Sequence, residues 1–374
     1  MRKHMSFRGR TAVVIVVFFA AVFALAASRS GDLHLWLLAA AVPGAALVIL
    51  LLPSSLLFLD RPSLAAAVTL CGFGLMADAL LSSGAVFSRA VYYAGALVFL
   101  LCGAVFIRVY RVSFPSSVII AATALGMISV PLWLSGLFSL TGGGILLLLV
   151  AAASFLSLRM YLPALGSVLC GILFLLMQQE FSGSAVLCLS GLILFWVSSG
   201  SGLWSCIAFI TMIGMPAVYT WLFLPLSSES HGSVLSHLTA LTLLAPEAPA
   251  ESADPVSGSL FILLGEQFGL VFLFFSLLLL CTLMVRGSVI AQEARKPFHA
   301  SAAFCAVLFF GLRVLFFILS VADILPLPAV ELPLLTGSLP DLCADFFLLG
   351  LLSGVAYRNE SDLQEDARLS MLAR

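Results

Sequence analysis

The stretch Gly265-Glu266-Gln267-Phe268-Gly269-Leu270-Val271-Phe272 opens a long apolar run, from about 259 to 285. A carboxylate in such a run needs a role, because a charge at the centre of a membrane span costs about 2.5–3.5 kcal/mol on insertion scales. The longest polar segment, 227–258, lies just before this run, and a proline-rich segment, 324–333, follows the next apolar run. Most of the evidence for function therefore lies in the C-terminal third.

Composition decides the class of protein. Hydrophobic residues make up 62% of the chain and charged residues 9%, whereas soluble domains carry about 25% charge. The net charge of −1 is uninformative about nucleic acid, and the sequence has no basic stripe that would suggest a nucleic-acid partner. The eight cysteines lie in or beside apolar runs and lack metal-ligand spacing, so we interpret them as small apolar residues. The basic segment 1–10 and the apolar run 11–28 predict a retained first span rather than a cleaved signal peptide.

Apolar runs recur along the whole chain, and crossing a membrane takes about 20 such residues. They predict an all-α polytopic membrane protein, a helical bundle of about twelve spans at 11–28, 35–59, 64–85, 90–109, 116–137, 143–157, 160–178, 184–199, 203–225, 259–285, 300–322 and 341–357. Apart from Arg29 and Arg89, the arginines and lysines at the ends of spans fall on one side if both termini are cytoplasmic. This orientation places 227–258 outside.

The outer segment 227–258 holds six acidic or histidine residues, among them Glu247, Glu251 and Asp254. A loop of this length in a compact protein is usually functional or disordered, so a functional loop and a simple connector both remain open. The C-terminal segment 358–374 carries mixed charge and predicts a short solvated helix.

Several short motifs follow one another along the chain. Ser236-His237-Leu238 is followed by Pro246-Glu247, and then by Gly265-Glu266-Gln267-Phe268-Gly269. These residues resemble the S-H-L-x-x-L-P-E and G-E-E-L-G motifs of the SEDS proteins (shape, elongation, division and sporulation), the FtsW/RodA/SpoVE group. The segment from Leu325 to Leu339 is similar to the family's later L-P-x-x-G-containing segment, and Gln179 to Ala185 is similar to its Q-P-D-L-G-T-A motif. The resemblance is strongest over 236–357.

The resemblance implies a domain organisation. SEDS proteins have ten spans with the large outer loop after the seventh, whereas the loop here follows the ninth predicted span. We therefore expect two extra spans in 1–62, a SEDS-like membrane core in 63–357 with its outer loop at 227–258, and a cytoplasmic tail in 358–374.

The resemblance also implies a function. SEDS proteins are peptidoglycan glycosyltransferases that polymerise lipid II, a disaccharide-peptide on an undecaprenyl diphosphate carrier, at the outer face of the bacterial cytoplasmic membrane. The implied partners are this lipid-linked substrate, membrane lipid and a class B penicillin-binding transpeptidase. A divalent cation bound with the diphosphate is the one cofactor left open. Roles in elongation, division and sporulation are not distinguished.

Polymerisation of this kind needs a general base and a positive charge near the leaving diphosphate. The family's catalytic aspartate corresponds to Gly258 here, so Asp254 is the first candidate base, followed by Glu251 and Glu247. For each of these residues, ordinary solvation of a loop acid is the alternative.

The candidate substrate-binding residues are Glu266, Arg313, His237, Gln179 and Glu180. The alternatives are a boundary cap for Gln179 and Glu180, and an unliganded loop histidine for His237. Arg313 and Glu266 lie at similar depths in consecutive spans and predict a buried ion pair that braces the bundle or holds the diphosphate.

Asp78 is the alternative partner for Arg313 in this buried polar layer. Three departures from the family keep other functions open: Gly258, Phe181 in place of the Q-P-D aspartate, and Gly337-Ser338-Leu339 in place of Y-G-G. The chain is therefore an active glycosyltransferase or a catalytically inactive SEDS-like scaffold of the wall-synthesis complex. A transporter of lipid-linked sugars is the third alternative.

Overall fold

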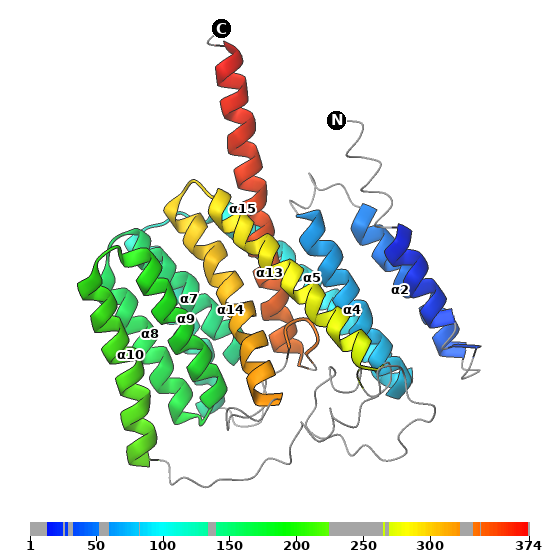
Figure 1. Ribbon diagram of the computed structural model, residues 1–374, viewed down its shortest axis with the longest axis horizontal. Coiled ribbons are helices and arrows are strands. Elements are labelled where there is room, and N and C mark those ends of the chain that lie inside the picture. Colours follow the sequence, from blue (N-terminus) through cyan, green and yellow to red (C-terminus); the bar gives the residue numbers. More distant parts are fainter. Residues whose placement is uncertain are drawn as a thin grey trace.

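The protein is a bundle of apolar helices (Figure 1). The computed structural model describes residues 13–24, 27–28, 33–51, 60–81, 83–133, 140–223, 265, 269–321, 332–336 and 338–372. Every regular element within these ranges is a helix, and none of them contains a strand. The predicted all-α polytopic class is confirmed.

Each predicted apolar run has a helix of its own. The helices are Val13–Ala24, α2 (Leu33–Leu51), α4 (Arg61–Leu81), α5 (Ser83–Val109), α6 (Phe114–Trp133), α7 (Thr141–Ser157), α8 (Tyr161–Met177), α9 (Phe181–Ser199), α10 (Gly202–Phe223), α13 (Leu270–Glu293), α14 (Pro297–Val321) and α15 (Leu339–Leu372). Within the described residues, five helices are long and apolar enough to cross a membrane: Arg89–Val109, Phe181–Ser199, Val271–Glu293, Pro297–Ser320 and Leu339–Leu363. The other apolar helices are shorter.

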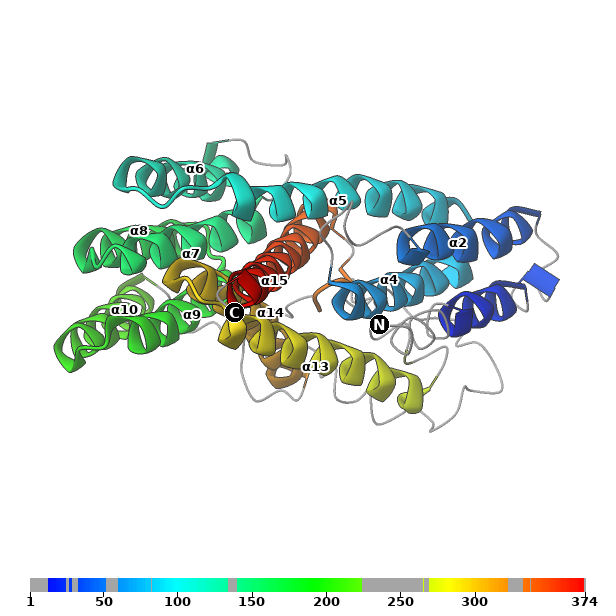
Figure 2. The ribbon, with the colours of Figure 1, turned by 90° about the horizontal axis from the view of Figure 1, so that it is seen from above.

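Helix α15 organises the bundle. It packs against α4, α5, α7, α13 and α14. Seen from above, it lies between the group formed by α6 to α10 and the group formed by α2, α4 and α5 (Figure 2). The first half of α15 is therefore enclosed by protein, whereas its C-terminal half projects beyond the bundle (Figure 1).

Glycines allow α5 and α15 to approach closely. A Cβ at Gly350 would overlap the backbone oxygen of Leu100, and one at Gly103 would overlap the backbone oxygen of Phe347. Gly354 lies one turn further along α15 and faces Ala104 in the same way. Small residues four apart drive close helix packing in membranes, where lipid removes the hydrophobic drive between helices. This seam fixes α15 in the bundle.

Two helices differ from their predicted bounds. Helix α13 covers Leu270–Glu293 rather than 259–285. Its N-cap is Gly269, whose φ of 84° and ψ of 172° favour glycine over other residues. At its other end it continues past the apolar run to Glu293. In this extension Arg286 forms an ion pair of 3.0 Å with Asp60, which precedes α4.

Helix α15 shows the second difference, since it runs without a break from Leu339 to Leu372. The predicted tail, 358–374, is therefore mainly a continuation of the last span. At 1.5 Å per residue the 34-residue helix is about 51 Å long, longer than the hydrocarbon core of a bilayer. The boundary expected at 62/63 stays a prediction.

Candidate functional site

The charged residues gather at the two ends of the bundle. At one end, Arg108, Arg111, Lys296 and Arg358 line one cavity and Arg159 lines another. The positive-inside rule predicts that this basic end is cytoplasmic. At the opposite end α10 finishes at Phe223 and α13 starts. The predicted outer segment is thus joined to the end away from the basic cavities, and we call this the outer end.

A buried ion pair lies toward the outer end. Nη1 of Arg313 in α14 donates to Oδ1 of Asp345 in α15 over 2.7 Å. The side chains are 8% and 0% exposed, and the guanidinium also lies over the ring of Phe309. Removal of one partner of such a pair leaves an uncompensated buried charge, at a cost of about 3–5 kcal/mol. The pair therefore braces α14 against α15.

The same carboxylate holds the segment that precedes α15. The backbone N–H of Leu334 donates to Oδ2 of Asp345 over 2.8 Å. Leu334 has a φ of 65°, a left-handed conformation that is uncommon for a leucine. Two residues later the carbonyl oxygen of Thr336 accepts a hydrogen bond of 2.7 Å from Nη1 of Arg89 in α5. Two charged side chains from two helices thus hold a buried, strained segment, 332–336.

A serine and an aspartate define the start of α15. Oγ of Ser338 donates to Oδ2 of Asp341 over 2.5 Å, and it accepts from the backbone N–H of Asp341 over 3.4 Å. This arrangement is an N-cap, and a carboxylate in the first turn is favoured by the helix dipole. It fixes the Asp341 carboxylate at the outer end.

Glu180 lies near this carboxylate. It precedes α9 in a tight turn where Gln179 has a φ of 61°, and the side-chain amide of Gln178 donates to the carbonyl oxygen of Ile128. The pKa of Glu180 is raised above its ordinary value, mainly because the protein removes water from the carboxyl group, and further by the Asp341 carboxylate. Two carboxylates therefore interact at the outer end, that of Glu180 before α9 and that of Asp341 in the first turn of α15.

A glycine at the start of α7 makes room for this pair. A Cβ at Gly142 would overlap Oδ1 of Asp341. The sequence Thr141-Gly142-Gly143-Gly144 begins the helix, so Asp341 lies against an N-terminal turn that carries no side chain at the point of contact. Backbone N–H groups at a helix N-terminus are favourable neighbours for a carboxylate.

Most of the predicted site residues lie outside the described part of the chain: Asp254, Glu251, Glu247, His237 and Glu266. The side chain of Asp78 is also outside it, so the predicted pairing of Arg313 with Glu266 or Asp78 stays a prediction. Arg313 is buried and paired, as the predicted polar layer requires, and the described partner is Asp345. Gln179 and Glu180 lie in the turn beside Asp341.

Sequence reasoning missed Asp345, Asp341 and Arg89. The depth estimate counted residues along straight spans, and it compared Arg313 only with Glu266 and Asp78. One signal was present, because Arg89 was an exception to the charge asymmetry. An arginine on the wrong side for the positive-inside rule suggests a specific partner in the protein, here the carbonyl oxygen of Thr336.

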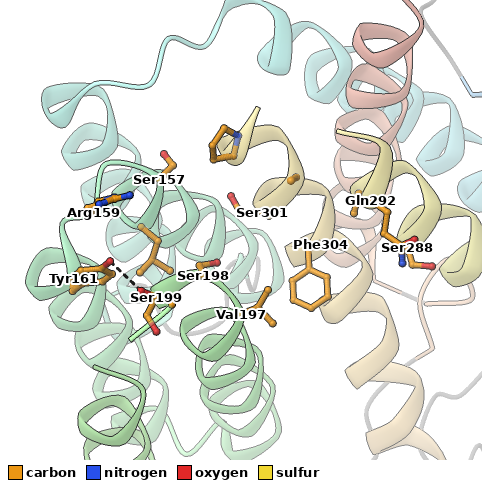
Figure 3. A pocket seen from close by; sticks show the side chains of 15 residues that line it. Ser157, Arg159, Tyr161, Val197, Ser198, Ser199, Ser288, Gln292, Ser301 and Phe304 are labelled. Carbon is orange, nitrogen blue, oxygen red and sulfur yellow. Dashed lines mark hydrogen bonds between the residues drawn. The ribbon is translucent and has the colours of Figure 1, made fainter. Parts of the chain in front are cut away.

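The basic end contains a cavity of about 810 Å³ (Figure 3). It lies between α8 and α9 on one side and α13 and α14 on the other, and serines, Arg159, Gln292 and Phe304 line it. The hydroxyl group of Tyr161 donates to the carbonyl oxygen of Ser199 in its wall. We expected a cavity between these same spans beneath the 227–258 loop. The described cavity is at the other end, and the loop lies outside the described residues.

In the described part of the chain, no group of three histidine, cysteine or acidic residues could hold a metal ion. The described side chains of the outer end have a chemistry that suits sugars and phosphates. Two neighbouring carboxylates can accept sugar hydroxyl protons, and arginine can bind phosphate.

Comparison with known proteins gives a family match for part of the chain and a similar fold for most of it. The family model of the FtsW/RodA/SpoVE cell cycle proteins matches residues 255–361. No curated protein matches the chain. The fold is similar to a chain of a peptidoglycan synthase complex that coordinates polymerization and crosslinking, with a TM-score of 0.60, 16% identity, and coverage of 80% of this chain and 98% of that chain.

The fold is also similar to the rod shape determining protein RodA of Thermus thermophilus. A mutant of RodA with one aspartate changed to alanine gives a TM-score of 0.59 at 17% identity over 80% of this chain and 97% of that chain. The unmutated RodA gives a TM-score of 0.55 at 16% identity over the same shares. The structural likeness shows the fold, and the matched region contains Arg313, Asp341 and Asp345. Residues 255–361 of this chain thus match the SEDS family, the FtsW/RodA/SpoVE group, and the fold of the chain is similar to that of RodA.

Proposed function

We propose that this protein acts in peptidoglycan synthesis as a glycosyltransferase that polymerises lipid II at the outer face of the bacterial cytoplasmic membrane. One observation carries the proposal. The region that matches the family model, 255–361, supplies the whole buried arrangement of the outer end except Arg89: Arg313, the segment 332–336, Asp341 and Asp345. The region of the family match thus contains the buried ion pair and the segment that it holds.

The reaction sets clear chemical requirements. An acceptor hydroxyl oxygen bonds to the anomeric carbon of the donor sugar, and its proton goes to a base. The bond between that carbon and the undecaprenyl diphosphate oxygen breaks, and the electron pair leaves with the diphosphate. The site therefore needs a carboxylate beside the acceptor and a cation beside the leaving group.

We assign these roles to residues at the outer end. Asp254 is the proposed base, with Glu251 and Glu247 as alternatives in the same loop. Glu180 and Gln179 orient the acceptor sugar. A carboxyl group with a raised pKa, such as Glu180, suits proton exchange near neutral pH better than an ordinary glutamate does.

Binding of the donor involves other residues. Arg89 supplies positive charge for the diphosphate, and His237 and Glu266 contact the donor. A divalent cation bound with the diphosphate would add to this charge. Arg313 is buried in an ion pair with Asp345, so we assign it a structural role that supports the site rather than a contact with the donor.

Polymerisation of labelled lipid II by the purified protein, with a partner transpeptidase present, tests the proposal. The wild-type protein should form glycan chains. Asp254→Ala should lower the rate by about 10²–10⁴-fold, the usual contribution of a general base. Glu360→Ala is the matched control, because it removes an exposed acid near the far end of α15. Undiminished polymerisation after removal of Asp254, Glu251 and Glu247 together would exclude the loop acids as bases.

A catalytically inactive scaffold is the second candidate, and specific residues favour it. Gly258 stands where the family has its aspartate, and Phe181 replaces the aspartate of Q-P-D. A scaffold would bind its partner and form no glycan with any transpeptidase. Absence of polymerisation together with retained partner binding, measured by co-purification, would favour this function over the first.

A class B penicillin-binding transpeptidase is the proposed partner. The similar synthase complex coordinates polymerization and crosslinking, and crosslinking is the reaction that a transpeptidase performs. Both candidate functions predict this partner. Transport of lipid-linked sugars is the remaining alternative, and a flipping assay with labelled lipid in liposomes measures it directly.

A further inference from the structure

A second cavity of about 600 Å³ lies at the basic end, away from the proposed active site. It is bounded by the end of α5, the connection from α5 to α6, the start of α14 and the middle of α15. Four cationic side chains line it: Arg108, Arg111, Lys296 and Arg358. Among the residues that the structure describes, no acidic one lines it. Such a concentration of one charge sign in a concave surface raises the local concentration of anions.

Protein contacts leave most of this charge uncompensated. Within the part of the chain that the structure describes, Arg111, Lys296 and Arg358 form no ion pair. Arg108 lies over the ring of Tyr357, with its guanidinium carbon 4.5 Å from the ring centre. Asp362 is the acid that acts electrostatically on this region, one turn beyond Arg358. The cavity thus contains three cations that are not neutralised by an ion pair with any residue that the structure describes.

The wall of the cavity is preformed. The Tyr110 hydroxyl is hydrogen-bonded to the Ser154 hydroxyl over 2.8 Å, and the ring of Tyr110 packs on Phe298 at 5.1 Å between centroids. The His299 side chain lines the cavity, and it makes no hydrogen bond to any described residue. Its ring nitrogens are not among the fully buried side-chain atoms of the described residues that lack a hydrogen bond. His299 is therefore a polar group of the wall that can donate to or accept from an occupant of the cavity.

Apolar residues beside the cavity place it at the depth of lipid headgroups. Val109 and Phe114, on either side of Arg111, are 72% and 48% exposed, and Leu158 in the cavity wall is 37% exposed. In a membrane-spanning bundle such side chains face acyl chains. Cations directly above an apolar, lipid-facing surface match an amphiphile with an anionic head better than they match a soluble anion.

We infer that this cavity binds the headgroup phosphate of an anionic phospholipid, with the acyl chains lying along Val109 and Phe114. Arg111, Lys296 and Arg358 contact the phosphate, and His299 adds a hydrogen bond. Basic pockets between helices at the cytoplasmic surface are known places for such headgroups. The inference does not depend on the proposed glycosyltransferase activity.

Lipid binding to the full-length protein in a neutral detergent tests the inference. Native mass spectrometry would count bound lipids, and the thermal unfolding midpoint would be followed with added phosphatidylglycerol, phosphatidylcholine or inorganic phosphate. Phosphatidylglycerol should bind and raise the midpoint, while phosphatidylcholine and inorganic phosphate should have little effect. Each cation near anionic lipid contributes about 1 kcal/mol, or about fivefold in affinity.

Substitutions of the cationic residues test whether phosphatidylglycerol binds in this cavity. The triple variant Arg111→Gln, Lys296→Gln, Arg358→Gln should weaken phosphatidylglycerol binding on the order of 100-fold. The control variant Arg61→Gln, Arg159→Gln, Arg295→Gln removes equal charge outside this cavity and should retain the affinity. Equal losses in the two variants would overturn the inference, because they would indicate a diffuse electrostatic effect.

Two further outcomes would also overturn it. Equal binding of phosphatidylcholine would exclude a site for an anionic headgroup, and inorganic phosphate binding as tightly as the lipid would exclude the lipid as the specific occupant. If the triple variant does not fold, Arg111→Gln and Lys296→Gln are measured singly. Both residues are exposed, and each exchange should weaken phosphatidylglycerol binding about fivefold.

Discussion

At the outer end of the bundle Arg313 and Asp345 neutralise each other inside the protein, whereas at the basic end Arg111, Lys296 and Arg358 surround a cavity without ion pairs to described residues. The difference follows from what each charge contacts. Asp345 accepts hydrogen bonds from a side chain and from a backbone N–H, so it determines the path of the segment before α15. The cations of the basic end determine no backbone path and are available to an external anion.

The number of charged residues at one end of the bundle therefore does not indicate the role of that end. A buried, hydrogen-bonded charge makes a structure rigid, and its loss leaves its partner unpaired in a medium of low dielectric constant. An exposed cation is solvated in the free protein, and its loss changes stability little. Substitutions at the two ends should therefore differ in size and in what they affect.

The largest expected effect is that of Asp345→Ala. It leaves Arg313 buried without its described partner and removes the acceptor for the Leu334 N–H, so the free energy of unfolding should fall by about 3–5 kcal/mol. Thermal unfolding of the purified protein in detergent would measure the change. The double variant Arg313→Met, Asp345→Leu should recover much of the loss. A single variant as stable as the wild type would contradict the role of the pair.

A smaller loss is expected for Arg89→Gln. The guanidinium of Arg89 donates to the carbonyl oxygen of Thr336, and a hydrogen bond to a charged group contributes about 1.5–3 kcal/mol. The same unfolding measurement would report it, and protease digestion would show whether the segment 332–336 becomes accessible. Arg89→Lys keeps the charge and should lose less. An equal loss in both variants would indicate that geometry rather than charge matters at this position.

Ser338→Ala should cost about 1 kcal/mol. It removes the side-chain cap of α15 and the hydroxyl that orients Asp341. The unfolding midpoint should fall modestly. Ser361→Ala is the matched control, because its hydroxyl bonds within an exposed part of the same helix, and it should change the midpoint less than Ser338→Ala does.

The pH dependence of Glu180→Gln provides a fourth test. The folded-state pKa of Glu180 is raised by removal of water and by Asp341, so between its unfolded and folded pKa values the folded state binds more protons. Stability from this group is therefore lost as pH rises through that window. Glu180→Gln should raise the unfolding midpoint at pH 8 relative to the wild type, and the difference should vanish below the ordinary glutamate pKa, about 4.3. A larger gain at acidic pH would contradict burial as the cause of the raised pKa.

The smallest effect on stability belongs to the basic end. Arg111→Gln changes an exposed side chain without an ion pair to any residue that the structure describes, so unfolding in detergent without added lipid should change by less than about 0.5 kcal/mol. A loss comparable to that of Asp345→Ala would remove the contrast between the two ends.

Composition and periodicity determined the class of fold. A chain with 62% hydrophobic residues and recurrent runs of span length can satisfy its backbone in a membrane only as helices or a closed barrel. Each predicted run corresponds to an apolar helix of the structure. The motifs near Gly265 and Leu325 also pointed to the family whose model matches residues 255–361. These features depend on local sequence and need no knowledge of which helices touch.

Only the tertiary structure decided which charges meet. Asp345 and Arg313 are 32 positions apart, and Arg89 and Thr336 are 247 apart. Depth counted along straight spans pointed to Glu266 or Asp78 as partners for Arg313, because it took no account of the buried segment between α14 and α15. The glycine seam of α5 and α15 and the left-handed Leu334 set the actual positions of these groups. Helix formation follows from local sequence, whereas the pairing of charges follows from the close packing of distant segments, where burial makes every unpaired polar group costly.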